Sequence, residues 1–266
     1  IGILPGVDRT YVPRYEVGLT LNEIEATFEQ APYLYQMGCE NVTPTTDASG
    51  DGIFSYTFPV ETTDIKTSTS LETYTFEVGN NFEAREVEYC YARSFTFSGD
   101  AGQGLMMSAD LVGRQSSTCT FTGSLSIPSV EEVLFSKGKL YVDAVSGTIG
   151  TTQVSQAFLS MNLSVNTGWT HVYTGDGELY FSFVKQAIPE VILEVTFEQS
   201  TDGVAQYDAW LAETAKQIRV QFDGSDASKY LRFDMAGKWD NFGPTMEERD
   251  GNDIVTGTFR GRYNST

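Results

Sequence analysis

The chain has 266 residues, which is enough for one large or two ordinary domains. Its 36 acidic residues outnumber 17 Lys and Arg and give a net charge of -19, which argues against tight binding of a nucleic-acid backbone because such binding needs basic residues to replace counterions. A hydrophobic content of 40% with 13% aromatic residues excludes wholesale disorder.

The N-terminal stretch Ile-Gly-Ile-Leu-Pro-Gly has neither the charged n-region nor the apolar h-region of a signal peptide. The absence of an initial Met indicates an unseen leader or processing. No stretch reaches the roughly 18 consecutive apolar residues of a membrane-spanning helix, so we predict no membrane segment.

Alternation of apolar and polar residues dominates the chain and predicts half-buried strands. It is clearest in Leu159–Asn166, where the two kinds of residue change places at every step. The predicted strands are 15–21, 74–78, 105–111, 159–166, 191–197, 218–222, 231–235 and 254–263. Turn signals at Asp202-Gly203, Asp223-Gly224 and Asp250-Gly251 complete the pattern of a mostly antiparallel β protein.

Two segments have a helical period. The first is Asn22–Ala31, in which Asn22 can cap, Glu25 can reach back and Pro32 blocks continuation. The second runs from about Ala205 to Ala215. Its residues at the spacing i, i+3, i+4 and i+7 are Tyr207, Trp210, Leu211 and Thr214.

Each predicted helix follows a strand and precedes several more, so the order of elements indicates an internal duplication. The Ser- and Thr-rich run from Gln115 to Pro128 is the candidate junction. We therefore predict two domains, 1–125 and 126–266.

Three loops carry weak motifs. Asp47–Gly52 resembles the beginning of a calcium loop, but position three is Ser49 and position twelve is Phe58 where Glu is needed, so a surface turn is predicted. Gly99–Gly104 has glycines in the wrong order for a dinucleotide fingerprint and is predicted as a hairpin loop. Asp250–Asp253 is predicted as a tight hairpin turn.

The residues that usually carry chemistry are few. Cys39, Cys90 and Cys119 lie far apart and outside any CxxC pair, so we expect reduced, structural cysteines. His171 is the only histidine and lies in a polar stretch, Gly168–Gly177, where a solvated loop residue is expected. No catalytic residue, cofactor or metal site is predicted, and an enzyme is not expected.

Acidic residues lie on the polar face of several predicted strands, so the negative charge belongs to the folded surface. Together they could form a negative wall that keeps a passing polyanion from adhering. These residues are Glu77, Asp110, Glu194, Glu198 and Asp234.

The C-terminal stretch Leu231–Trp239 followed by Asp250–Asn264 resembles the C-terminal end of major tail tube proteins of long, non-contractile-tailed, siphovirus-like bacteriophages. Other similar blocks are Glu88–Gly102, Ala109–Arg114, Asn166–Trp169 and Gln221–Gly224. They cover most of the chain from about residue 70 to its end.

The resemblance implies a mainly β chain with two tail-tube-type β-sandwich or half-barrel domains, each with one flanking α-helix. It implies self-assembly into rings stacked as a tube: trimeric, pseudo-hexameric rings for a chain with two such domains, or hexameric rings for one. The lumen would enclose the tape-measure protein and later conduct double-stranded DNA during ejection. Tail completion proteins would bind the tube ends. The expected location is the virion tail, assembled in the host cytoplasm.

Rings of this kind need two contacts. Sheet edges that meet around the ring would satisfy backbone groups that otherwise invite aggregation. Axial stacking needs a separate interface, for which the loops 47–52 and 99–104 are candidates. Their candidate inter-ring residues are Asp47, Asp51, Gly99, Asp100, Gly102 and Gly104. The acids named above are candidates for the lumen wall.

The alternative is a β-sandwich carbohydrate-binding module or glycoside hydrolase, because many acids on β-sheets with many aromatics also suit that class. Trp169, Trp210 or Trp239 would then be a sugar-stacking platform, although core roles are favoured for Trp210 and Trp239. An extracellular adhesin or pilin is a third hypothesis, but it should carry a signal peptide or a donor strand.

Overall fold

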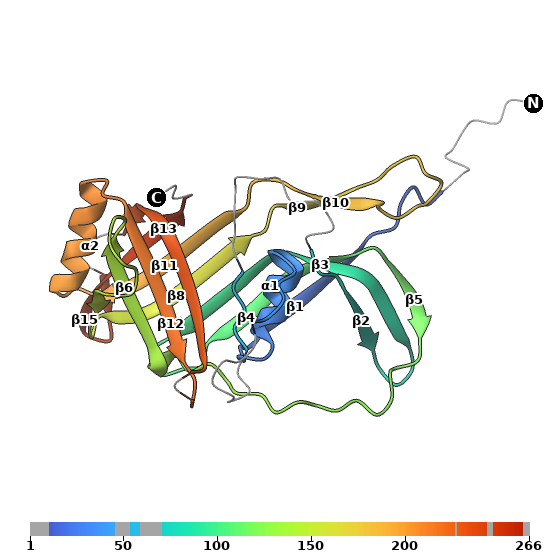
Figure 1. Cartoon of the computed structure of the whole chain (residues 1–266), viewed down its shortest axis with the longest axis horizontal. Helices are drawn as coiled ribbons and strands as arrows, with labels where there is room; N and C mark the ends of the chain where they lie inside the picture. The colour runs from blue at the N-terminus through green and yellow to red at the C-terminus, as the bar shows by residue number, and fades with distance from the viewer. Residues whose placement is uncertain (1–10, 46–53, 59–70, 227, 244–246, 263–266) are drawn as a thin grey trace, which may run out of the picture.

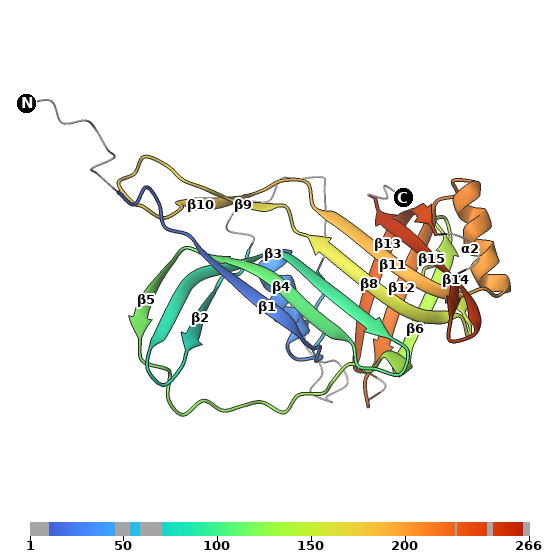
Figure 2. The ribbon, with the colours of Figure 1, turned by 180° about the vertical axis from the view of Figure 1, so that it is seen from behind.

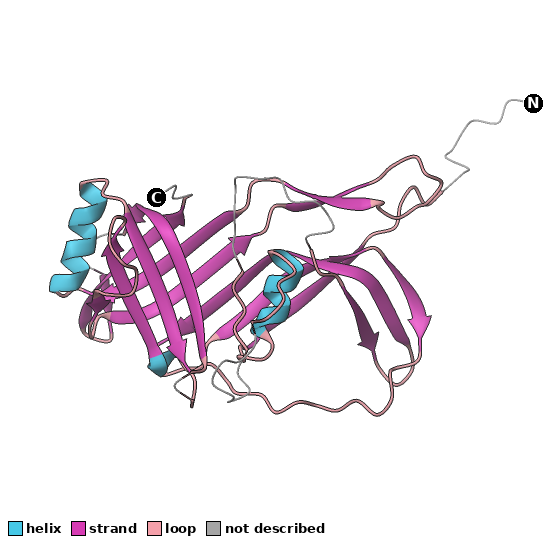
Figure 3. Cartoon of the chain, in the orientation of Figure 1, coloured by secondary structure: helices cyan, strands magenta, loops and turns pink. Residues whose placement is uncertain are grey.

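The computed structural model describes residues 11–45, 54–58, 71–226, 228–243 and 247–262. This part of the chain is mainly β, as predicted, with one large antiparallel sheet and two α-helices (Figures 1 and 3). In these residues, no helix is both long and apolar enough to cross a membrane.

In chain order the elements are β1 (Val17–Glu25), α1 (Ala31–Gly38), β2 (Tyr74–Gly79), β3 (Ala84–Asp100), β4 (Met106–Gly113), β5 (Gln115–Cys119), the 3₁₀ helix η2 (Phe135–Lys137), β6 (Gly138–Ala144), β7 (Gln153–Val154), β8 (Phe158–Asn166), β9 (Trp169–Val172), β10 (Phe183–Gln186), β11 (Glu190–Glu198), α2 (Thr201–Leu211), β12 (Lys216–Asp223), β13 (Tyr230–Phe242), β14 (Glu247–Arg249) and β15 (Asn252–Gly261).

A 13-stranded sheet passes through both halves of the chain in the order β1-β4-β3-β8-β11-β15-β13-β12-β6-β7. Strands β2 and β5 also pair with β3, and β14 pairs with β15. The sheet bends at β13, which pairs with β12 through its first residues and with β15 through its last. Figure 2 shows β1, β4, β3, β8 and β11 side by side, seen from the side opposite α1.

The inward side chains of these strands form one core that is shared by the two halves. Phe95 and Phe97 of β3, Leu163 of β8 and Leu193 of β11 are all buried in it. Leu34 of α1 joins them. Burial of each such side chain contributes about 1.5–3 kcal/mol, so the alternation found in the sequence fixes which face of each strand turns inward.

The same strand order occurs twice. It is β1-β4-β3-β2 in the first half and β11-β15-β13-β12 in the second, with a helix after the first strand in each. β3 has a bulge between Ala92 and Ser94, and β13 has one between Trp239 and Asn241. We call the first set, with α1, unit A and the second, with α2, unit B.

The candidate junction between the halves is only partly irregular. The first residues of the Ser- and Thr-rich run, Gln115–Cys119, form strand β5 paired with β3, which the sequence did not indicate. The predicted boundary between residues 125 and 126 falls in the connection from β5 to β6 and stays a prediction.

The first predicted helix is wrong. Asn22–Glu25 end strand β1, and helix α1 begins at Ala31, with Pro32 in its first turn. Proline suits this place because its fixed φ is helical and its missing N–H would have no partner there. Pro32 therefore starts a helix where we expected it to stop one.

The second predicted helix exists but begins and ends earlier than expected. α2 runs from Thr201 to Leu211, and the Ser200 hydroxyl accepts a hydrogen bond from the Gly203 N–H at 3.5 Å. The predicted turn at Asp202-Gly203 is therefore wrong, because an N-cap serine draws these residues into the first helical turn.

The other described turns agree with the predictions. Asp250 and Gly251 have φ of 53° and 83° and join β14 to β15. Gly99–Gly104 contains the turn between β3 and β4, with Gly102 at φ 88°. Asp47–Gly52 lies outside the described residues.

Asp143, at the end of β6, holds the following loop. Its carboxylate accepts hydrogen bonds from the Gly150 N–H at 2.7 Å, the Thr151 N–H at 3.1 Å, the Thr151 hydroxyl at 2.6 Å and the Thr152 N–H at 2.8 Å. Burial alone would raise the pKa of Asp143, but these donors outweigh it and lower the pKa to about 2. The ionised carboxylate is therefore a buried acceptor for this loop.

We expect Asp143→Asn to lower the free energy of unfolding by about 2 kcal/mol at pH 7. A depressed pKa gives stability that is present above the unfolded value near 4 and lost as the pH falls toward 2. The difference between wild type and variant should therefore shrink between about pH 4 and pH 2 in urea unfolding. Asp208→Asn, at an exposed site on α2, is the control, and an equal loss in both variants would contradict the prediction.

Candidate functional site

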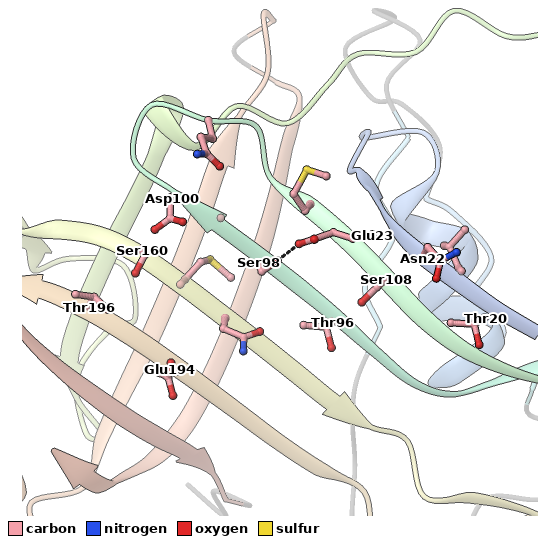
Figure 4. A pocket seen from close by; sticks show the side chains of 16 residues that line it. Thr20, Asn22, Glu23, Thr96, Ser98, Asp100, Ser108, Ser160, Glu194 and Thr196 are labelled. Carbon is pink, nitrogen blue, oxygen red and sulfur yellow. Dashed lines mark hydrogen bonds between the residues drawn. The ribbon is translucent and has the colours of Figure 1, made fainter. Parts of the chain in front are cut away.

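The outward side of strands β1, β4, β3, β8 and β11 carries mostly short, polar side chains (Figure 4). The strand register aligns them in rows across the sheet: Ser108 faces Thr96, Thr96 faces Ser164, Ser98 faces Asn162, and Asn162 faces Glu194. We call this surface the polar face; it is formed by Thr20, Asn22, Thr96, Ser98, Ser108, Ser160, Asn162, Ser164, Glu194 and Thr196.

The polar face is hollowed into an open groove of about 620 Å³. Its lining includes the acids Glu23, Asp100 and Glu194 and contains no Lys or Arg among the described residues. Hydroxyl and amide side chains offer a polyanion no strong electrostatic attachment, and the acids repel it. The groove spans unit A and unit B, because β8 pairs with β3 of unit A along one edge and with β11 of unit B along the other.

Arginines around the polar face are paired with acids. The Arg93 guanidinium lies 2.5 Å from the Asp110 carboxylate, and the Arg249 guanidinium lies 3.1 Å from that of Asp100. Arg260 pairs with both Glu190 and Asp240. These ion pairs neutralise the arginines and also Asp100, so the negative charge at the groove comes from Glu23 and Glu194.

One of the five predicted acids belongs to the polar face, and a second lies beside it. Glu194 lines the groove, and Asp110 lies on β4 opposite Thr20. Glu198 ends β11 outside the groove lining. The other two lie elsewhere: Glu77 on β2 accepts hydrogen bonds from Thr122, and Asp234 on β13 pairs with Arg219.

Glu23 and the whole set of Ser, Thr and Asn side chains were not predicted as site residues. The signal was present at alternate positions of β8, where Ser160, Asn162, Ser164 and Asn166 are all short and uncharged. A strand that faces ordinary solvent usually carries some charge, so this uniformity marks a special surface.

A hairpin formed by β9 and β10 with their connections, residues 167–189, projects from one end of the polar face (Figures 1 and 2). We call it the arm. Trp169 anchors it to unit A, because the indole is 1% exposed and its Nε1–H donates to the Gly38 carbonyl at 2.9 Å. Phe181 and Val184 pack in the same buried cluster, beside Tyr91 of β3.

The expectation for His171 is wrong, because it lies in strand β9 and its side chain is only 16% exposed. Its ring stacks on Phe181, its Nδ1 lies 3.2 Å from the Tyr91 hydroxyl, and its Nε2 lies 3.6 Å from the Glu16 carboxylate. Pairing of β9 with β10 draws this residue out of the loop we predicted. It is a packing residue of the arm.

The hairpin Gly99–Gly104 lies at the opposite end of the polar face from the arm. In the β3–β8 ladder, Asp100 faces Ser160, whereas the arm follows Asn166 at the other end of β8. The arm exposes apolar side chains at Leu179, Phe183 and Ile188, with exposures of 40%, 40% and 83%. The polar face is therefore flanked along the strands by two projections.

Two of the three tryptophans have no exposed face for a sugar. Trp169 and Trp239 are 1% and 4% exposed, which corrects the platform role considered for Trp169 and confirms the core role of Trp239. Trp210 is half-buried, packs against Tyr207 with ring centroids 5.4 Å apart, and donates its Nε1–H to the Asp240 carbonyl at 3.4 Å.

None of the three cysteines forms a disulfide bond; Cys39 and Cys90 are buried and Cys119 is half-buried. Burial raises the pKa of Cys90 to about 11, so its thiol stays protonated at neutral pH. Within the described ranges, no group of three or more His, Cys, Asp or Glu side chains is placed to hold a metal ion.

Comparison with known proteins gives no family: no protein-family model matches the sequence, and no curated protein matches it significantly.

Proposed function

We propose that the chain is the structural subunit of a bacteriophage tail tube, in which rings stack around a lumen lined by the polar face. The observation that carries the proposal is the groove across both units, with short polar side chains, acids and no Lys or Arg in its described lining. Double-stranded DNA slides past such a wall because it meets no site that releases its counterions. The tape-measure protein fills the same lumen before ejection.

The repeat within the chain supports a trimeric ring. Unit A and unit B are already joined by β8, which pairs with β3 on one edge and with β11 on the other, so that they continue one sheet. Three chains placed edge to edge around an axis present six units, which gives pseudo-sixfold symmetry and closes the sheet edges. A hexameric ring of chains with two units each would contain twice as many units.

The two projections support stacking. The arm and the Gly99–Gly104 hairpin leave opposite ends of the polar face, along the direction in which rings would stack. The exposed Leu179, Phe183 and Ile188 of the arm give it apolar area for contact with the next ring. At the tube ends, tail completion proteins would take the place of that ring. The subunit has no catalytic role in this function, and its place is the virion tail.

Negative-stain microscopy and light scattering of the purified protein over a range of concentrations test the proposal. In negative stain we expect rings or tubes of uniform diameter. In light scattering we expect the mass of a ring to equal that of three chains. A monomer at every concentration would contradict the assembly. A reconstruction whose lumen is lined by the β12–β6 layer would contradict the role of the polar face.

A further inference from the structure

The outer edge of β1 differs from the corresponding edge in unit B. There the first strand, β11, has a neighbour on both sides, β8 on one and β15 on the other. In unit A the first strand, β1, pairs with β4, and among the described residues it has no neighbour on its second edge. Unit A therefore lacks a counterpart of β8.

The two first strands can be aligned residue by residue. Arg114, which follows β4, donates its backbone N–H to the Glu88 carbonyl, and Arg262, which follows β15, donates to the Ala236 carbonyl. Three residues before these arginines, Leu111 faces Leu19 of β1 and Phe259 faces Leu193 of β11. Corresponding residues of β1 and β11 are therefore Val17 with Val191, Leu19 with Leu193, Thr20 with Glu194, and Leu21 with Val195.

Side-chain burial differs between these equivalent positions. Leu193 and Val195 of β11 are both 0% exposed, whereas Leu19 and Leu21 of β1 are only partly buried. On β8, Leu163 and Met161 stand directly beside Leu193 and Val195 and help to cover them. The apolar side of β1 has the exposure expected of a strand whose neighbour is missing.

We propose that the open edge of β1 binds one added strand, which runs antiparallel to β1 and is supplied by another polypeptide chain. The partner is an extended peptide with the alternation of β8: apolar residues beside Val17, Leu19 and Leu21, and short, uncharged residues on the side of the polar face. Main-chain hydrogen bonds along the edge give affinity, and the alternate apolar side chains give specificity. An acidic strand is disfavoured by Glu23 and Glu25 of β1.

The edge site follows from the repeat and does not need the proposed tube. One further step does rest on that function. In a ring, the added strand would also pair with the outer edge of β13 and β14 of the neighbouring copy, as β8 pairs with both β3 and β11 within the chain.

A synthetic peptide with the sequence of β8, residues 158–166, tests the edge site on the full chain. We expect saturable binding in fluorescence anisotropy and new hydrogen-exchange protection at residues 17–21. A peptide with Leu163→Asp should bind at least tenfold more weakly, whereas the control Ser164→Thr should bind as well as the original.

Two N-methylated peptides make the test specific for a sheet edge. An antiparallel strand uses the N–H groups of every second residue toward one neighbour. We therefore expect the two methylated peptides to differ at least tenfold in binding. One is methylated at Met161, Leu163 and Val165, and the other at Ser160, Asn162 and Ser164. Equal effects of the two methylated peptides would overturn the proposal. So would the absence of peptide binding, or new protection at residues other than 17–21.

A second copy that pairs directly with this edge gives a different result. Protection of residues 17–21 would then rise with protein concentration and the peptide would not compete, which also overturns the proposal. Failure of the tube function is distinguishable, because peptide binding is measured on the full chain at protein concentrations below those at which rings form.

Discussion

Replacement of Trp169 by Ala is expected to lower the free energy of unfolding by about 3–5 kcal/mol and to release the arm from unit A. The indole is 1% exposed, so its removal leaves a cavity among Tyr91, Phe181 and Val184. It also removes the hydrogen bond to the Gly38 carbonyl, which leaves a buried acceptor unpaired. Urea unfolding measures the loss.

Two further variants separate these effects. Trp169→Phe removes the hydrogen bond but keeps an aromatic ring in the cluster, so its loss should be about 1–3 kcal/mol, smaller than that of Trp169→Ala. Trp210→Ala is the control, since that indole is half-buried on α2 and its removal should cost less than Trp169→Ala. A Trp169→Ala loss no larger than the Trp210→Ala loss would contradict the anchoring role.

Trp169→Ala also bears on the proposed stacking. With the arm released, we expect rings to form while tubes become short or absent in negative stain. In the proposal, rings depend on backbone pairing at the sheet edges, which the substitution leaves unchanged. Normal tubes from a folded Trp169→Ala protein would mean that the arm does not join the rings.

Alternation predicted most strands because a period of two needs only local sequence. The helix α1 was misplaced because Asn22 and Glu25 fit a capping pattern, whereas pairing of Leu19 and Leu21 with β4 keeps that segment extended. The β4 partner lies about ninety residues later in the sequence, and such long-range pairing is not visible in a local pattern. Tertiary pairing also overrides the loop character of the stretch around His171.

The candidate site was only partly predictable for a related reason. Charge singled out acids on many strands, but the register decides which of them share a surface, so Glu194 meets the groove while Glu77 and Asp234 do not. The polar face is built mainly from Ser, Thr and Asn, whose side chains carry no individual signal. The register of β3 with β4 and β8, and of β8 with β11, brings them into rows.

Lysines placed on the polar face are expected to make the tube retain DNA, if the proposed function holds. The triple variant Thr96→Lys, Asn162→Lys and Glu194→Lys puts three cations on neighbouring strands of the groove. A trimeric ring would then present about nine lysines. That number of phosphate contacts weakens the binding of DNA by about 10³–10⁵-fold between 50 and 200 mM salt. The lysines should therefore give the groove a salt-dependent affinity for DNA that the wild-type groove lacks.

Open-ended tubes incubated with a short DNA duplex and then treated with nuclease measure this effect. We expect wild-type tubes to leave no protected duplex and the groove variant to protect duplex at low salt and release it at high salt. The control Gln199→Lys, Glu213→Lys and Thr214→Lys makes the same change of charge at exposed positions beside α2, so its bound DNA should remain open to nuclease. Equal protection by the groove and control variants would place the polar face outside the lumen, because only lysines that surround the duplex can shield it.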